Sequence, residues 1–174
     1  MNVHLVIKIQ NSWVQIAVKG KIKKGPKALP NFDLNTIDRR LEVLGPAGER
    51  DFAVNIPNEI KFTAVPRQFF SCIWGGNPQE TFPIIGAKFL EKHGLNDFMY
   101  PNLLWNPHGP QIPGCAGLFF EPNGLDSPGE DSPYVHRVIV RLPEGPTWLY
   151  VGNYQQISSP ALTKDEWLMQ AQKV

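Results

Sequence analysis

Cys115 is the residue best suited to nucleophilic chemistry. It lies in the segment PGCAG, whose small side chains would leave backbone N–H groups free to face an oxyanion, as acyl transfer requires. His108 or His136 would act as its base, and Asn106 or Asp126 would orient that base. A cysteine between a proline-glycine turn and the apolar segment GLFF is more often a small core residue. A cysteine-dependent hydrolase is therefore the third of our hypotheses.

The sequence contains no familiar catalytic or metal-binding motif. Its histidines show neither H-x-H nor H-E-x-x-H spacing, and its two cysteines, Cys72 and Cys115, are far apart. The hydrolase elbow G-x-S-x-G, the phosphate-binding P-loop and the dinucleotide fingerprint G-x-G-x-x-G do not occur. We therefore expect neither a metal nor a cofactor, and the sequence does not establish whether the protein is an enzyme.

A run of lysines would suit contacts with nucleic-acid phosphates. The segment KGKIKKGPK combines lysine with glycine and proline, which predicts a solvated loop. The alternative is an ordinary charged surface, because exposed lysines are common near loops. The predicted phosphate-binding residues are Lys19, Lys21, Lys23, Lys24, Lys27, Arg39 and Arg40.

Aromatic side chains on the last predicted strand would suit stacking on a base. Trp148, Tyr150 and Tyr154 are predicted to share one face, with Gly152 leaving a gap between the rings. The alternative is that these rings pack helices onto the sheet, since aromatic stripes on strands are usually core. The loop of residues 105–117 would shape the pocket through Trp105, Asn106 and His108.

These residues support two binding hypotheses. The favoured one is a non-catalytic module that binds nucleic acid, with a modified or flipped base as the ligand that a stacking platform suits. The alternative is a module that uses its aromatic, proline-rich surface to bind a protein, a peptide or a second copy of itself. The two differ in salt dependence, because phosphate binding weakens steeply as salt rises.

Charge and cysteine content limit the partners and the cellular location that we expect. The net charge is +1, so nucleic-acid binding would need a local basic patch. No apolar run approaches the 18 residues of a membrane span, and the N-terminus lacks a signal-peptide pattern, so we expect no membrane partner. Two scattered cysteines indicate an intracellular protein, with the nucleus favoured over the cytoplasm.

The elements that would position these residues form one domain, residues 1–174, since 174 residues with 42% hydrophobic content suffice for one core. Residues 1–56 are predicted to form β-hairpins. The first hairpin follows the alternation of Leu5, Ile7 and Ile9 and then of Val14, Ile16 and Val18, and the second pairs residues 39–44 with 51–56. A short helix from Thr36 is the alternative to that second hairpin.

Residues 57–96 are predicted to form a helical insert. Pro66 suits the first turn of a helix that ends at Gly75-Gly76 and places Phe69, Phe70, Ile73 and Trp74 on one face. A second helix covers about residues 82–93 and ends at Gly94, with Ile85, Phe89 and Leu90 inward and Lys92 and His93 near its C-terminus.

The remaining chain is predicted to form a proline-rich loop and a hairpin. Residues 97–133 are irregular, apart from a strand near residues 116–121. Residues 134–142 and 148–154 flank the turn PEGPT and form the hairpin. Thr163 and Glu166 form a capping box that opens a short C-terminal helix.

Four motifs carry a family resemblance. They are a proline-arginine-aromatic helix ending in paired glycines (Pro66, Arg67, Gly75, Gly76), an NP…P…PG…G loop (Asn106, Pro107, Pro113, Gly114, Gly117), a Y-x-G-x-Y strand (Tyr150, Gly152, Tyr154) and a closing L-T-x-x-E-W (Leu162, Thr163, Glu166, Trp167). Together they resemble a family of uncharacterised domains common in basidiomycete fungi, over about residues 60–170. The resemblance implies a fungal, intracellular setting and brings no activity with it.

The predicted fold class is α+β. We expect a curved, mostly antiparallel sheet or a partly open β-barrel, with two short central helices, a short C-terminal helix and long ordered loops. The order of elements is similar to that of PUA-like barrels, a likeness of fold that does not assign function.

Overall fold

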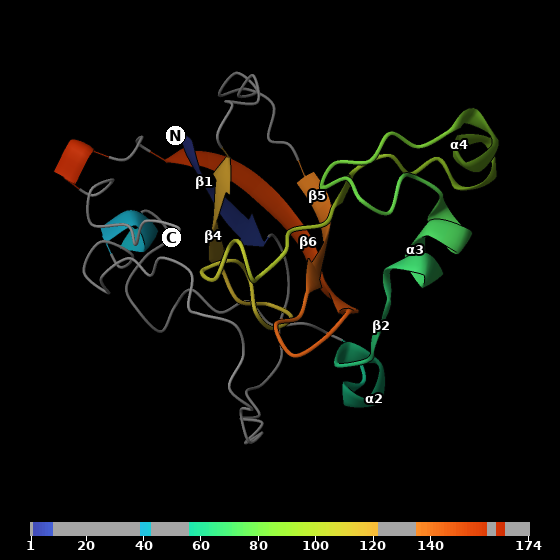
Figure 1. Ribbon diagram of the computed structural model, residues 1–174, viewed down its shortest axis with the longest axis horizontal. Coiled ribbons are helices and arrows are strands. Elements are labelled where there is room, and N and C mark those ends of the chain that lie inside the picture. Colours follow the sequence, from blue (N-terminus) through green and yellow to red (C-terminus); the bar gives the residue numbers. More distant parts are fainter. Residues whose placement is uncertain (1, 9–38, 43–55, 122–134, 160–162, 166–174) are drawn as a thin grey trace.

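A computed structural model describes residues 2–8, 39–42, 56–121, 135–159 and 163–165 of the chain (Figure 1). Its elements, in chain order, are β1 (Asn2–Lys8), α2 (Asn58–Lys61), β2 (Ala64–Pro66), α3 (Arg67–Trp74), α4 (Ala87–His93), β3 (Phe98–Met99), β4 (Gly117–Glu121), β5 (Val135–Arg141) and β6 (Thr147–Ser159). The predicted α+β class is confirmed for the described residues.

The strands form an open, mixed sheet in the order β3-β5-β6-β1-β4, with β2 also paired to β6. The pairs β5–β6, β1–β6, β1–β4 and β2–β6 are antiparallel, and β3–β5 is parallel. Since the order ends at β3 and β4, which do not pair with each other, the described strands do not close into a barrel. Figure 1 shows β6 as a long, bent strand, with α3 and α4 beyond the β5 side of the sheet.

The hairpin β5–β6 contains a bulge that the period-two pattern did not predict. Val138 lies opposite Gly152 and Ile139 opposite Tyr150, so Val151 is an extra residue in β6. Gly152 has φ 129°, a value that favours glycine. An extra residue reverses which face the following side chains occupy. The prediction that Trp148, Tyr150 and Tyr154 share one face is therefore wrong.

The sheet has a buried cluster on each face. The valine-rich cluster consists of Met99, Leu103, Phe119, Val138, Val140, Leu149, Val151 and Tyr154, with Phe82 and Leu142 packed against it. The aromatic cluster consists of Phe70, Ile85, Phe98, Tyr100 and Ile139, and among the side chains packed against it are Trp74, Phe89, Trp148 and Tyr150. Alternation along β5 divides its side chains between the two.

Helix α3 begins and ends as its sequence predicts. Pro66 is its N-cap and Gly75, with φ 80°, is its C-cap. Its inward face is narrower than predicted. Phe70 is buried and Trp74 half-buried, whereas Phe69 and Ile73 are exposed. In Figure 1, α3 packs at the margin of the sheet, so only part of its apolar surface meets the core.

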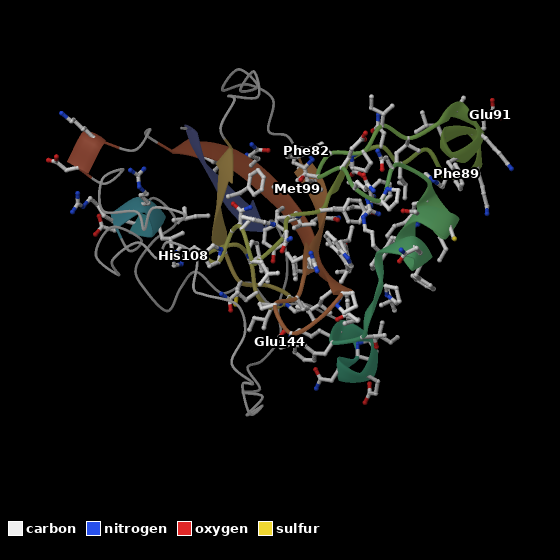
Figure 2. All side chains as sticks on the ribbon, viewed as in Figure 1. Phe82, Phe89, Glu91, Met99, His108 and Glu144 are labelled. Carbon is white, nitrogen blue, oxygen red and sulfur yellow. The ribbon has the colours of Figure 1, made fainter. Side chains whose placement is uncertain are left out.

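Helix α4 ends at Gly94 as predicted, with Lys92 and His93 in its last turn, but it begins at Ala87 rather than near residue 82. The preceding segment, which contains Pro83 and Ile85, instead packs against the end of α3. An added Cβ on Gly76 would lie 2.8 Å from Pro83 and 3.1 Å from Ile85, so these two side chains lie directly against the C-terminal end of α3. Phe89 packs on Gly75 in the same way (Figure 2).

Two N-terminal predictions have different outcomes. The predicted strand at Leu5 and Ile7 is confirmed as part of β1, which lies between β6 and β4. Residues 39–41 are helical rather than extended, as their helix-forming residue types favour. Of the predicted partner strands, residues 14–18 and 51–55 lie outside the described residues, and Ile56, the last residue of the predicted strand 51–56, is not in a strand.

The proline-rich loop leads into β4 by a tight backbone contact. The N–H of Leu118 donates to the carbonyl of His108 at 2.7 Å, and an added Cβ on Gly117 would lie 2.4 Å from the nitrogen of Pro110. Gly117 therefore allows two backbone segments to touch. At the other end of the described chain, Lys164 and Asp165 are helical directly after Thr163, and Glu166 lies outside the described residues.

Candidate functional site

The predicted lysine patch lies outside the described residues. This holds for Lys19, Lys21, Lys23, Lys24 and Lys27, and also for Asp126. Arg39 is exposed and Arg40 half-buried on the helical turn at residues 39–41. The phosphate-binding role of this set stays a prediction.

The predicted stacking platform is divided between the two faces of the sheet. Tyr154 is fully buried in the valine-rich cluster. Trp148 and Tyr150 are half-buried on the other face, where the ring of Trp148 lies edge-on to Tyr100 at 5.8 Å. The hydroxyl of Tyr150 donates to Oδ1 of Asn153 at 2.8 Å. Trp148 and Tyr150 thus share a face that Tyr154 does not, and their stacking role stays a prediction.

The predicted pocket loop is ordered, and its members differ in exposure. Trp105 is 55% exposed, whereas Asn106 is buried and His108 half-buried beside β4 (Figure 2). Asn102 shapes this loop, because its Oδ1 accepts the N–H of Leu104 at 2.9 Å. The loop thus presents an exposed ring on a hydrogen-bonded turn.

Of the two predicted bases, His108 lies in the same proline-rich loop as Cys115, whereas His136 lies on a distant strand. Cys115 is half-buried just before β4, while His136 is on β5, and β6 and β1 lie between these two strands. Burial lowers the pKa of both His108 and His136, which favours neutral imidazole. A pairing of Cys115 with either base stays a prediction.

Arg67 is the residue whose importance the sequence analysis missed. It opens α3, yet its side chain is only 5% exposed. The guanidinium carbon lies 3.3 Å from the ring centre of Tyr100 and 5.7 Å from that of Trp148, both within cation–π range. The Pro66-Arg67 pattern contained the available signal, but its aromatic partners come much later in the chain.

Hydrogen bonds hold the Arg67 side chain in this position. Its Nη1 donates to Oγ of Ser71 at 3.1 Å, and its Nη2 donates to the carbonyl of Asn77 at 3.2 Å. Burial lowers the pKa of Arg67 and raises that of Tyr100, and the nearby guanidinium opposes part of the rise at Tyr100. Within the described residues, no carboxylate forms an ion pair with Arg67.

A second arginine nearby does have a carboxylate. Arg137 on β5 pairs with Asp97, and its backbone N–H donates to the Asp97 carbonyl at 2.7 Å. Burial raises the pKa of Tyr150, and the cation of Arg137 opposes this shift. This face of the sheet therefore has a half-buried aromatic ring beside an arginine whose charge is neutralised by Asp97.

Exposed apolar side chains accompany the aromatic cluster. Phe69 is 50% exposed and Ile73 40% exposed, one helical turn apart on α3. The ring of Phe69 meets that of buried Phe70 edge-on at 5.7 Å. Since the one charged residue of α3 is the buried Arg67, the exposed side of this helix is uncharged.

The described part of the chain lacks two further features, a metal-binding group and a membrane-spanning helix. It contains no group of three histidine, cysteine, aspartate or glutamate side chains placed to hold a metal ion. None of its helices has both the length and the apolar character needed to cross a membrane.

A family model for a domain of unknown function, DUF6697, matches residues 64–174. The match begins at β2 and includes α3, the proline-rich loop and the β5–β6 hairpin. The resemblance to an uncharacterised domain family is thereby confirmed, while its fungal distribution and the likeness to PUA-like barrels stay predictions. Neither the curated proteins nor the solved structures include a match.

Proposed function

The chain belongs to the DUF6697 family, and from its residues we propose that it is a non-catalytic binding module whose exposed apolar surface takes a protein partner. The observation that carries the proposal is the pair Phe69 and Ile73 on an otherwise uncharged helix face. Large apolar side chains that remain exposed beside a packed aromatic cluster are typical of interaction surfaces.

The proline-rich loop supplies a second exposed apolar surface. Trp105 is 55% exposed and Ile112 48% exposed. Tryptophan is among the residues that contribute most to binding energy at interfaces. Because neither residue belongs to a buried cluster of the described core, changing them should leave the fold intact.

The test is selection of short peptides on the folded chain, followed by titration of the selected peptides in solution. Changing Phe69→Ser together with Ile73→Ser should weaken binding at least about tenfold, since each loses buried apolar area. Ile60→Ser is the matched control, because Ile60 is 65% exposed and belongs to a different helix, α2.

Light scattering on the same proteins covers the case in which the partner is a second copy of the chain. A protein that selects no peptide and stays monomeric at all concentrations would refute the proposal. Equal binding by the α3 variant and the Ile60→Ser control would refute its assignment to α3.

Nucleic-acid binding is the second candidate, and one arrangement supports it. Trp148 lies opposite Arg141 across the hairpin, on the face that also holds Tyr150 and Arg137. Rings for stacking and cations for phosphates are thus adjacent, as binding of a single-stranded or flipped base requires. The paired state of Arg137 reduces the charge available to a phosphate.

Fluorescence anisotropy with labelled single-stranded, double-stranded and base-modified oligonucleotides tests this candidate. Binding that weakens steeply with salt and is lost in Tyr150→Ala would support it. Absence of binding at low salt would remove nucleic acid from the candidates.

A further inference from the structure

We propose that Arg67 and Tyr100 form a binding site for an anionic oxygen, of either a carboxylate or a phosphate group. The site does not depend on the proposed function. It rests on two buried polar groups whose hydrogen-bonding capacity the described protein does not satisfy.

The first group is the guanidinium of Arg67. Guanidinium has five N–H donors, and the hydrogen bonds to Ser71 and Asn77 use two of its terminal nitrogens. Its Nε is fully buried and has no hydrogen-bond partner in the described protein. A buried cation is costly unless a negative charge accompanies it, and no described carboxylate pairs with this one.

The second group is the hydroxyl of Tyr100. The residue is 2% exposed, and its hydroxyl oxygen forms no hydrogen bond of normal geometry in the described protein, although the Arg67 guanidinium interacts with it. Buried hydroxyl and N–H groups are nearly always hydrogen-bonded, so two unsatisfied groups at one place require an explanation.

The two groups are close together. The guanidinium carbon lies 3.3 Å from the centre of the Tyr100 ring, and the hydroxyl is attached to that same ring. Both Nε–H and O–H are donors, and a carboxylate or phosphate accepts from two donors at once. An anionic oxygen here would satisfy both groups and supply the missing negative charge.

The other arginine on this side of the sheet provides an internal comparison. Arg137 has Asp97 as its counter-charge, although both side chains are partly exposed and need it less. Arg67, which is more deeply buried, has an aromatic ring on which to stack and no described carboxylate. This contrast points to a counter-charge supplied from outside the described protein.

Arginine-selective NMR of the full chain tests the proposal through the Nε–H signal of Arg67. Titration with inorganic phosphate and, separately, with acetate should shift this signal with saturation, beyond the shift caused by chloride at equal ionic strength. A response to phosphate alone identifies a phosphoryl ligand, and a response to acetate alone identifies a carboxylate.

Tyr100→Phe removes the hydroxyl while keeping the ring under the guanidinium. It should weaken anion binding about tenfold, the loss expected for one hydrogen bond to a charged group. Thr63→Val, which removes an exposed hydroxyl bonded to the carbonyl of Glu59, is the control and should bind as the unchanged protein does. The proposal is overturned if neither anion shifts the Arg67 signal, or if Tyr100→Phe titrates like the control.

Discussion

The two faces of the β5–β6 hairpin bury different kinds of polar group. On the valine-rich side these groups are uncharged side chains, the buried amide of Gln156 and the half-buried imidazole of His136. The hydroxyl of Tyr154 donates to the carbonyl of Val151 at 3.3 Å, within the same strand. On the aromatic side the buried polar groups include the cation of Arg67, which lies against the ring of Tyr100.

The two sides also differ at their margins. The valine-rich cluster includes five side chains with no exposed surface, Met99, Val138, Val140, Val151 and Tyr154. The aromatic cluster has half-buried rings packed against it, and Phe69 and Ile73 on α3 are exposed. Exposed apolar side chains lie beside both clusters, since Trp105 and Ile112 are exposed on the proline-rich loop next to the valine-rich one. The aromatic side alone combines such side chains with a buried arginine that has no described carboxylate. We therefore propose that binding takes place on the aromatic side.

Two tyrosines of one strand give the largest test of this difference. Tyr154→Ala should reduce the free energy of unfolding by about 3–5 kcal/mol, because it leaves a cavity in a fully buried cluster. Tyr150→Ala, on the aromatic side and half-buried, should cost about 1 kcal/mol, since less apolar area is lost. Urea unfolding measures both, and equal losses would show that the bulge does not separate the two rings.

Two glycines test how firmly the proline-rich loop is attached beside the valine-rich cluster. In Gly117→Ala the new methyl group would lie 2.4 Å from the nitrogen of Pro110 and 2.5 Å from the carbonyl carbon of Gly109. Both are backbone atoms, so the substitution should destabilise the fold by about 1–3 kcal/mol.

Gly145→Ala is the control, because nothing lies within 4 Å of its added Cβ. Its free energy of unfolding should stay within about 0.5 kcal/mol of the unchanged protein in the same urea experiment. If Gly117→Ala is equally neutral, the loop and β4 are not in fixed contact.

Local signals in the sequence predicted the elements that those signals define. Pro66 and Gly75 delimit α3, Gly94 ends α4, and the turn after Leu142 joins the two strands of the hairpin. Each depends on the backbone preference of one or two residues, which sequence alone supplies. The bulge at Val151 could not be predicted in this way, because period two loses its phase when one residue is added.

The candidate site was less predictable than the fold. Of the three rings predicted to form a stacking platform, Tyr154 is buried on the other face, and Arg67 was noted only as part of a motif. The burial of Arg67 depends on Tyr100 and Trp148. The β3–β5 and β2–β6 pairings bring these two rings beside it. Contacts between residues distant along the chain leave no periodic pattern in the sequence.

The smallest predicted effect is on how the free energy of unfolding depends on pH, and it distinguishes the two faces of the hairpin. Burial lowers the pKa of His136 below the ordinary value of 6.5, despite the opposing effect of Asp97. Below pH 6.5 the unfolded chain therefore binds a proton that the folded chain excludes, and the free energy of unfolding falls as the pH falls. The slope contributed by one such histidine is at most about 1.4 kcal/mol per pH unit.

Urea unfolding across this pH range should give a shallower slope for His136→Gln than for the unchanged protein. His108, whose pKa burial also lowers, accounts for part of the slope that remains. Arg67 keeps its charge throughout this range, so Arg67→Gln, which introduces no titratable group, should leave the slope unchanged. A slope that changes with Arg67 and not with His136 would mean that the titrating group lies on the aromatic side, and would reverse the comparison drawn between the two faces.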